Sequence, residues 1–461
     1  MIAGNDTIAA IATPSGNSGI GIVRISGTDA VKIADEVIRS RSGKSLDLFS
    51  VNSHTVHYGF IFDGNTVIDE VLCTVYRSPR SFTSEDTVEI NCHGGMFVLN
   101  RVLSLLLSKG ARLAEPGEFT RRAFLNGRID LSQAESVMDI ISSENEFSRS
   151  NSLSQLRGSV KEKVSALRDS ILHETAFIEA ALDDPEHYEI DDTYKNELRD
   201  KVYEILATIR NIIKNADDVR YLRNGINTVI VGKPNVGKSS LLNLFAGFDR
   251  AIVTNVPGTT RDTISERISL DGIILNITDT AGMHKSSDEV ENIGIRKAED
   301  EISKADLIIF VMDSSEKTDE EDIEIIDKIK EKTSIAVLNK TDKGSVITEN
   351  DINKYTDMPV IKMSVRENTG FDELRDKIKE LFIKDEIRDN EIYITNKRQT
   401  ELFKKAYDSL SSVINSIDRG MSEDVYTIDL MDAYAYLGEI TGEDISDDLA
   451  DKIFSEFCMG K

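Results

Sequence analysis

The chain of 461 residues has no tryptophan and only three cysteines, and long hydrophobic runs are missing. Cys73, Cys92 and Cys458 lie far apart, which excludes the spacing of a zinc site and a disulfide framework and fits a reducing compartment. No apolar run approaches the roughly 18 residues that span a membrane. The first residues lack the charged leader and apolar core of a signal peptide. We therefore expect a cytoplasmic protein without a membrane partner.

Positive charge is also scarce, because 55 lysines and arginines face 81 aspartates and glutamates, giving a net charge of -26. Such a chain does not bind nucleic-acid phosphates over a broad surface, so any RNA contact is expected to be local or shared with a partner. The length suggests about three domains. A hydrophobic content of 40% is ample for several cores.

What the chain does contain is a complete phosphate-binding loop. The pattern G-x-x-x-x-G-K-S runs from Gly232 to Ser239, between an apolar run at 228–231 and a helix-like segment at 240–244. That strand-loop-helix context is what the motif needs. Its glycines let backbone N–H groups surround phosphates at the positive end of the following helix. Lys238 is expected to reach the outer phosphates, and Ser239 to ligate Mg²⁺.

Three further motifs follow in order, each directly after an apolar run. Asp279-Thr280-Ala281-Gly282 follows residues 273–277 and offers a carboxylate for the magnesium shell and a glycine amide for the outermost phosphate. Asn339-Lys340-Thr341-Asp342 follows residues 335–338, and Ser364-Val365-Arg366 follows residues 360–363. Each motif alone is typical of any turn after a strand, but the ordered set resembles a GTPase domain of the Ras-like, translation-factor-related type.

The third motif selects the base. Asp342 can accept two hydrogen bonds from the ring N–H and exocyclic amine of guanine, whereas adenine presents the opposite pattern and would leave a buried carboxylate unpaired. The segment from Ser364 to Arg366 suits a backbone contact to the base carbonyl. The predicted nucleotide is therefore GTP.

The usual water-positioning group is missing. Ras-like enzymes place a glutamine just after the Asp-x-x-Gly motif, and this chain has Met283 there. Asp288, Glu289 and Glu291 follow as candidates, although at least two of them fit a solvated acidic loop. No arginine is marked as a finger. The segment 254–262 is a natural switch, whose carbonyls, with Asn235, can help to hold a monovalent cation that supplies charge worth roughly a thousandfold in rate.

The remaining sequence separates into a mixed part and a helical part. Strands are expected at 7–13, 20–25 and 87–93, and a helix at 97–107. Apolar residues then recur at gaps of three or four, which predicts helices, in three sets: Leu153, Leu156, Val160, Val164, Leu167 and Ile171; Val202, Ile205, Ile209 and Ile212; Ala406, Leu410, Val413 and Ile417.

We predict an α/β and α+β multidomain protein. An N-terminal α+β domain occupies residues 1–125, and a GTPase domain of α/β fold occupies residues 222–383. The economical arrangement joins 126–221 and 384–461 into one all-α domain, into which the GTPase domain is inserted. Two independent helical modules are the alternative.

The chain stops at Phe457-Cys458-Met459-Gly460-Lys461. A cysteine fourth from the end suggests prenylation, but glycine and a terminal lysine fit that signal poorly, so it is rejected. Ile453, Phe454 and Phe457 lie at helical spacing and predict a docked end rather than a frayed one. A docked thiol beside a lysine is nucleophilic if its pKa is lowered, which makes Cys458 a possible reactive thiol.

Over its whole length the chain resembles the bacterial tRNA uridine-modifying GTPases known as MnmE or TrmE. The switch and the terminal motif, combined with a GTPase domain, are highly specific. The matching pieces are residues 12–16, 21–27, 81–86, 92–95, 116–128, 258–262 and 457–461.

The resemblance implies a homodimer built through an N-terminal tetrahydrofolate-binding domain, and a flavin-dependent partner of the MnmG or GidA type, in a heterotetramer or larger assembly. Together they would add an aminomethyl or carboxymethylaminomethyl group to carbon 5 of the wobble uridine of certain tRNAs. The one-carbon unit would come from 5,10-methylene- or 5-formyl-tetrahydrofolate. Potassium would stimulate hydrolysis of GTP to GDP and phosphate when two GTPase domains meet.

The resemblance also implies site residues. The folate site would use Arg24, Glu89, Arg128 and Lys461, with Arg128 standing where the family often has lysine, so that a cation is kept with a different geometry. Glu291 would position the attacking water. Magnesium would be held by Ser239 and Thr260, and potassium by Asn235, Thr254, Val256 and Thr259. The GTP-binding residues would be Asn235, Val236, Gly237, Lys238, Ser239, Ser240, Thr254, Asn255, Val256, Pro257, Gly258, Thr259, Thr260, Asp279, Thr280, Ala281, Gly282, Asn339, Lys340, Asp342, Ser364, Val365 and Arg366.

Two rival functions stay open on the sequence. A ribosome-assembly or signalling GTPase explains the middle domain, but neither the N-terminal pieces nor the terminal motif. The second rival is a folate-dependent one-carbon transferase in which GTP is only regulatory.

Overall fold

A computed structural model describes most of the chain. The described residues are 6–143, 145–184, 187, 191–248, 265–270, 272–279, 301–382, 393–443, 446–455, 457 and 460. The chain divides into two compact units: one comprises Met1–Ile141, Leu153–Val202 and Lys405–Lys461, and the other Ser142–Ser152 and Tyr203–Lys404. None of the described helices is both long enough and apolar enough to cross a membrane.

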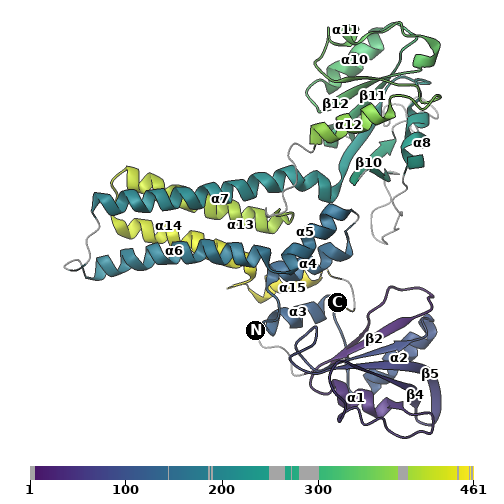
Figure 1. Cartoon of the computed structure of the whole chain (residues 1–461), viewed down its shortest axis with the longest axis vertical. Helices are drawn as coiled ribbons and strands as arrows, with labels where there is room; N and C mark the ends of the chain where they lie inside the picture. The colour runs from purple at the N-terminus through teal and green to yellow at the C-terminus, as the bar shows by residue number, and fades with distance from the viewer. Residues whose placement is uncertain are drawn as a thin grey trace, which may run out of the picture. The chain divides into compact units, whose positions relative to one another are not determined.

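The first unit contains a seven-stranded sheet in the order β3-β4-β5-β6-β2-β1-β7, antiparallel except for the β1–β7 pair. Its strands β2, β4 and β5 are labelled in Figure 1. The predicted strands and helix near the N-terminus correspond to β1, β2, β6 and α2. The elements are β1 (Ile8–Ile11), β2 (Gly21–Ser26), α1 (Ala30–Val37), β3 (Ile38–Arg39), β4 (Thr55–Asp63), β5 (Thr66–Tyr76), β6 (Thr87–Cys92), α2 (Met96–Ser108) and β7 (Arg112–Leu113).

Alternation along the strands decides which side chains meet the helices. Val23 and Ile25 of β2, and Val88 and Ile90 of β6, are buried in one core with residues of α1 and α2. Because successive side chains of a strand point to opposite faces, Arg24 and Glu89 lie on the face turned away from α1 and α2. This sheet therefore presents charged side chains on the side that its helices leave uncovered.

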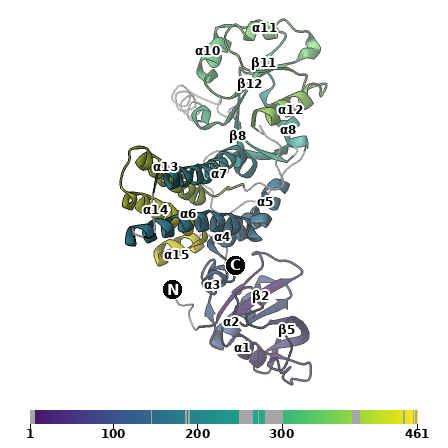
Figure 2. The ribbon, with the colours of Figure 1, turned by 60° about the vertical axis from the view of Figure 1, so that its left-hand side comes forward.

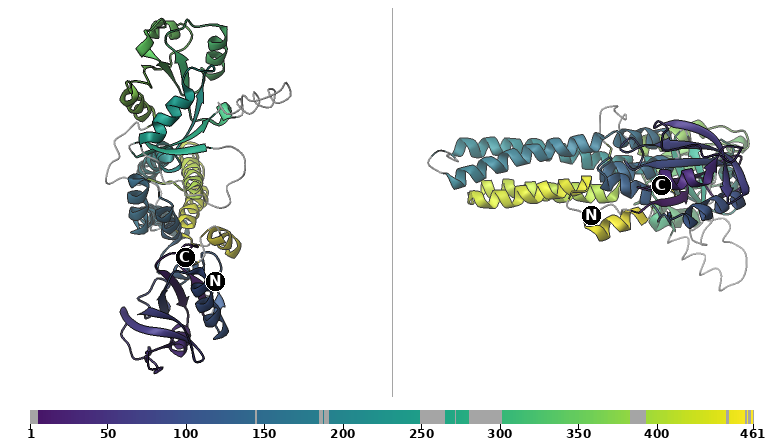
Figure 3. Two further views of the ribbon diagram at one scale, coloured as in Figure 1. Left: turned by 90° about the vertical axis from the view of Figure 1, so that its right-hand side faces the viewer. Right: turned by 90° about the horizontal axis from the view of Figure 1, so that it is seen from below.

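Helices from two distant stretches of the chain make up a helical domain. Helix α14 packs along α6, and the two stretches, teal and yellow, run side by side in Figures 1 and 3. The ion pairs Arg199–Asp418 (2.5 Å) and Lys195–Glu423 (2.8 Å) join the start of α7 to the later stretch. This packing confirms the predicted single helical domain and not the alternative of two independent helical modules. The helices are α3 (Glu118–Leu125), α4 (Leu131–Ile141), α5 (Glu146–Leu156), α6 (Ser159–Asp183), α7 (Asp192–Asn224), α13 (Lys397–Asp418), α14 (Glu423–Thr441) and α15 (Asp447–Ser455).

The apolar spacing from Leu153 to Ile171 predicts one helix face, but the structure breaks it into α5 and α6. Gly158 stands between them with φ of 102°, in the region that glycine adopts without a steric penalty. The apolar spacing continues through the break and therefore does not predict where α5 ends and α6 begins.

The second unit contains a six-stranded sheet in the order β13-β12-β11-β8-β10-β9. Neighbouring strands are parallel except for the antiparallel β9–β10 pair. Figure 2 shows the unit from a second side. The elements are β8 (Ile226–Val231), α8 (Lys238–Phe248), β9 (Ser265–Leu270), β10 (Ile273–Asp279), β11 (Leu307–Asp313), α10 (Glu320–Ile329), β12 (Ser334–Asn339), the 3₁₀ turn η2 (Thr341–Lys343), α11 (Glu349–Ile352), β13 (Val360–Lys362) and α12 (Phe371–Phe382).

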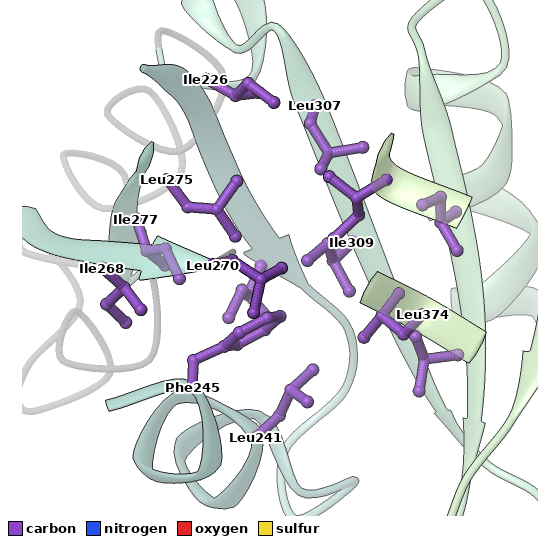
Figure 4. Packing of buried hydrophobic residues seen from close by; sticks show 14 of the residues in the cluster. Ile226, Leu241, Phe245, Ile268, Leu270, Leu275, Ile277, Leu307, Ile309 and Leu374 are labelled. Atoms are coloured by element: carbon purple, nitrogen blue, oxygen red, sulfur yellow. The ribbon is translucent and has the colours of Figure 1, made fainter. Parts of the chain in front are cut away.

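The sheet of the second unit is covered on both faces, which explains why its strands read as continuous apolar runs. On one face Leu241 and Phe245 of α8 pack with Ile277 and Ile309 of the strands and Leu374 of α12 (Figure 4). On the other face, the strands meet α10 and α11. Strand β8 has β10 on one side and β11 on the other, so chain order reverses there. Ligands bind at such a switch point, beyond the carboxyl ends of the strands, and the phosphate loop follows β8.

Candidate functional site

The phosphate loop leaves the end of β8 and enters the first turn of α8. Two of its glycines cannot be replaced by a larger residue. A Cβ on Gly232 (φ 143°) would lie 2.2 Å from the carbonyl oxygen of Val311, and one on Gly237 (φ 108°) would lie 2.2 Å from Nδ2 of Asn339. The loop is therefore packed tightly against the neighbouring strand β11 and the end of β12.

Side chains hold the carbonyl groups of this loop. Lys238, which is 9% exposed, donates from Nζ to the carbonyls of Gly232 (2.6 Å) and Lys233 (2.7 Å). The lysine that the motif assigns to the outer phosphates is thus bonded to its own loop.

The guanine motif holds the other half of the loop. Asn339 donates from Nδ2 to the carbonyl of Val236 at 2.8 Å, and Lys340 donates from Nζ to the carbonyl of Asn235 at 2.7 Å. Because C=O and N–H point in opposite directions across a trans peptide, the N–H groups of Val236 and Gly237 point away from these two bonds. Backbone donors are thereby freed on the opposite side, as anion binding requires.

The predicted base-binding residues come together in the structure. Asp342, whose side chain is 9% exposed, accepts from the hydroxyl of Ser364 at 2.8 Å, and Arg366 lies 3.9 Å from its other oxygen. The amide oxygen of Asn339 accepts from the backbone N–H of Val365 at 3.1 Å. Two loops that are distant in sequence are thus joined around one recessed carboxylate.

Two charged contacts at the loop were missed by sequence reasoning. Lys233 pairs with Asp319 (2.8 Å) and Asp322 (2.9 Å), the two residues of the capping box of α10. Burial acts to lower the pKa of Lys233, but these hydrogen bonds outweigh it, and the pKa lies above its usual value. Lys340 pairs with Asp313 at 2.6 Å.

Part of the predicted nucleotide site lies outside the described residues. Asp279 is placed by its backbone at the end of β10, opposite Ile230 of β8. Within the described ranges, no group of three or more histidines, cysteines and acids could hold a metal ion. The predicted residues outside those ranges are Thr254, Asn255, Val256, Pro257, Gly258, Thr259, Thr260, Thr280, Ala281, Gly282 and Glu291, together with Met283, Asp288 and Glu289.

A second candidate site lies on the uncovered face of the N-terminal sheet. Arg24 of β2 and Glu89 of β6 are direct cross-strand partners, and Nε and Nη2 of Arg24 lie 2.9 Å and 2.8 Å from one oxygen of Glu89. The hydroxyl of Tyr76 lies 3.4 Å from the other oxygen. The side chains of Arg24 and Glu89 are 14% and 20% exposed, so the pair is recessed but reachable.

A cavity of about 570 Å³ opens beside this pair. Arg128 stacks over the ring of Phe82, 5.1 Å from its centre, and donates to the carbonyl of Phe82 at 2.7 Å. Burial lowers the pKa of Arg128. The cavity thus combines aromatic walls, cations and one carboxylate. Its lining residues are His54, Tyr76, Pro79, Arg80, Ser81, Phe82, Thr87, Glu89 and Arg128.

Several of these lining residues were not predicted. Phe82 lies in a segment that carries the family resemblance, but nothing in the sequence marks His54 or Tyr76. His54 stands just before β4 with φ of 63°, and its ring meets that of Tyr76 edge-on at 5.3 Å. Only the register of β4 with β5 brings them together.

The end of the chain reaches this site. The carbonyl of Gly460 accepts from Nη1 of Arg24 at 3.1 Å, and a Cβ on Gly460 (φ 83°) would lie 2.4 Å from the carbonyl of Ile11. Phe454 and Phe457 are 2% and 7% exposed. The predicted docked end is confirmed for these residues, whereas Cys458 and Lys461 lie outside the described part.

The two cysteines that the structure describes are unsuited to catalysis. Burial raises the pKa of both Cys73 and Cys92 to about 12. A nucleophilic thiolate at neutral pH needs the opposite shift.

Comparison with known proteins covers nearly the whole chain. A family model described as the MnmE helical domain matches residues 131–458, and one described as the GTP-binding protein TrmE N-terminus matches residues 7–128. The tRNA modification GTPase MnmE of Lachnoclostridium phytofermentans is 50% identical over 457 residues, 99% of each chain. The protein of that name from Clostridioides difficile is 46% identical over 459 residues, 99% of each chain.

Among solved structures, the G domain of the T. maritima FeoB iron transporter is 29% identical, with a TM-score of 0.27 over 34% of this chain and 97% of that one. The identity to curated relatives over the full length of both chains, and the two matching family models, lead to one conclusion. The chain belongs to the MnmE family of tRNA modification GTPases.

Proposed function

We propose that this protein is a potassium-activated GTPase that acts with a flavin-dependent partner of the MnmG type. Together they modify carbon 5 of the wobble uridine in certain tRNAs, adding an aminomethyl or carboxymethylaminomethyl group whose one-carbon unit comes from a tetrahydrofolate. The observation that carries the proposal is the presence, in one member of this family, of a nucleotide site and a recessed Arg24–Glu89 pair beside a cavity.

The nucleotide site acts through its main chain. Backbone N–H groups of the phosphate loop donate to the phosphates, and Nζ of Lys238, which holds the carbonyls of Gly232 and Lys233, donates to phosphate oxygens when GTP binds. Asp342 accepts the guanine donors, while Ser364 fixes its orientation. GTP is hydrolysed to GDP and phosphate, with Glu291 positioning the attacking water.

The residues present fit a magnesium ion and a potassium ion. Ser239 is exposed at the first turn of α8, next to the phosphate lysine, and would hold magnesium together with Thr260. Asn235 is exposed, with φ of 64°, and its side chain forms no hydrogen bond among the described residues. It would hold potassium with Thr254, Val256 and Thr259. These ions supply positive charge to the phosphates as negative charge develops there.

The cavity on the N-terminal sheet fits a reduced folate, either 5,10-methylene- or 5-formyl-tetrahydrofolate. A carboxylate can accept a charge-assisted pair of hydrogen bonds from the amide and amine of a pterin ring. Arg24 fixes the orientation of Glu89 for this role. Arg128 and Arg80 supply cations for the acidic tail of the cofactor, and Lys461 completes the site.

The N-terminal sheet also supports a homodimer. Val56 and Tyr58 of β4 and Leu72 of β5 are 60%, 56% and 47% exposed. Tyr58 and Leu72 are cross-strand partners, and Val56 and Glu89 both lie opposite Thr74, so all share the face that carries the cavity. Burial of this apolar patch against a second copy would remove it from water. Such a homodimer would contain two GTPase domains.

We extend the proposal to the domain organisation. The N-terminal folate-binding and dimerisation domain comprises residues 1–125, the helical domain 126–221 and 384–461, and the GTPase domain 222–383. The net charge of -26 favours tRNA contacts that are local or shared with the flavoprotein.

Nucleoside analysis of tRNA tests the function as a whole. A strain lacking this protein is expected to lose the wobble-uridine modification, and the wild-type gene should restore it, as mass spectrometry of digested tRNA would reveal. An unchanged nucleoside profile would favour a signalling GTPase instead.

Asp342→Asn tests base recognition. The variant loses charge-assisted hydrogen bonds worth about 1.5–3 kcal/mol, so GDP and GTP should bind about ten- to a hundredfold more weakly, and base choice should loosen. Titration with a fluorescent GDP analogue measures this, and the exposed Asp357→Asn serves as the matched control. Unchanged affinity for Asp342→Asn would contradict the guanine assignment.

Replacing potassium by sodium tests the monovalent site. Turnover of GTP at saturating nucleotide should fall at least about tenfold, because the smaller ion fits the same oxygen ligands poorly and less charge reaches the transition state. Nucleotide affinity in both salts is the control. Equal rates in potassium and sodium would rule out the cation as activator.

Glu89→Gln tests the folate site. The affinity for 5-formyl-tetrahydrofolate, measured by calorimetry on the full chain, should fall about tenfold or more, since a neutral amide accepts weaker hydrogen bonds than a carboxylate. Glu70→Gln on the neighbouring strand is the matched control. Binding at wild-type affinity would remove Glu89 from the site.

A further inference from the structure

Asp313, the last residue of β11, lies beside the nucleotide loops and belongs to none of the GTPase motifs. Its side chain is 7% exposed. One carboxylate oxygen accepts from Nζ of Lys340 at 2.6 Å, and the other accepts from the backbone N–H (3.0 Å) and hydroxyl (2.6 Å) of Ser315. Burial acts to raise the pKa of Asp313, but these bonds outweigh it and lower the pKa. The carboxylate is therefore ionised and held from two sides.

The lysine that Asp313 holds has a second task. The same Nζ donates to the carbonyl of Asn235 in the phosphate loop at 2.7 Å. One ammonium thus connects the strand end, the guanine loop that carries it and the phosphate loop. Lys340 and Asn235 both have φ of 64°, a backbone conformation that needs support from surrounding contacts. The bridge joins the two residues at these positions.

The sheet sets the location of the carboxylate. Asp313 lies in register with Asn339, the residue before Lys340, on the parallel strand β12. A second carboxylate brace, Lys233 with Asp319 and Asp322, holds the phosphate loop but does not involve the guanine loop. Among the described ion pairs at the phosphate loop, the Lys340–Asp313 pair is the one that joins both loops, through the bond from Lys340 to Asn235.

We propose that Asp313 is a positioning residue for nucleotide binding: by holding the ammonium of Lys340 on the carbonyl of Asn235, it fixes the guanine loop and the phosphate loop at one separation. The site then binds the base and the phosphates of one nucleotide at the same time, so dissociation of the nucleotide is slowed. This role rests on the proposed binding of GTP, and it adds a group outside the recognised motifs to the site.

A double-mutant cycle on the full chain tests this role. Asp313→Asn, Lys340→Met and the double variant are compared by the dissociation rate of a fluorescent GDP analogue in stopped flow. Asp313→Asn should accelerate release about tenfold, because the neutral amide no longer holds the ammonium. If Asp313 acts through Lys340, the double variant should release nucleotide no faster than Lys340→Met alone.

Multiplying effects in the double variant, or release within twofold of wild type for Asp313→Asn, would overturn the proposal.

A matched control separates positioning from loss of strand stability. Asp306 stands just before the other end of β11, where it accepts from the backbone N–H of Asn227 at 3.1 Å. Asp306→Asn should lower the melting temperature without changing the dissociation rate. If it accelerates release as much as Asp313→Asn, the positioning role is refuted. A wild-type chain that fails to bind the analogue would refute the proposed function itself, together with this inference.

Discussion

The nucleotide site depends on hydrogen bonds made behind the phosphate loop rather than in front of it. Lys238 holds the carbonyls of Gly232 and Lys233. Lys340 holds the carbonyl of Asn235, and Asn339 holds that of Val236. A peptide plane held by its oxygen has its nitrogen fixed as well, so the loop needs little reorganisation to meet an anion. Two of these side chains belong to the guanine motif. Recognition of the base and shaping of the phosphate cradle therefore share one motif: Asn339 and Lys340 hold the loop, and Asp342 faces the base.

In the N-terminal sheet, too, one side chain has two roles. Cross-strand register places Arg24 opposite Glu89, and the same arginine donates to the carbonyl of Gly460 near the end of the chain. One guanidinium, with its planar set of donors, orients a carboxylate and anchors a terminus. The sheet face that carries this pair also carries the apolar patch of Val56, Tyr58 and Leu72. Cofactor binding and association of two copies are thereby proposed for one face.

Local signals explain what could be predicted from the sequence. Each GTPase motif follows its own strand, so order and spacing were enough for the fold of the second unit and for the meeting of Asp342 with Ser364. Local sequence motifs did not predict the contacts between residues that are far apart in the sequence. The sequence around Lys233 does not indicate its ion pair with Asp322, and the sequence around Tyr76 does not indicate its ring contact with His54. The break at Gly158 was also missed, because the apolar spacing continues through this position. The helix ends there because of the positive φ of the glycine backbone, which the spacing does not reflect.

The packing of α6 against α14 has a consequence for biosynthesis. These helices stand on either side of the inserted domain in the sequence. At about 5–20 residues per second, a ribosome needs on the order of tens of seconds to deliver the second helix after the first has emerged. During that interval α6 lacks the helix that packs along it in the folded chain. The inserted domain carries its own hydrophobic core, so it can fold during that interval without the later helices.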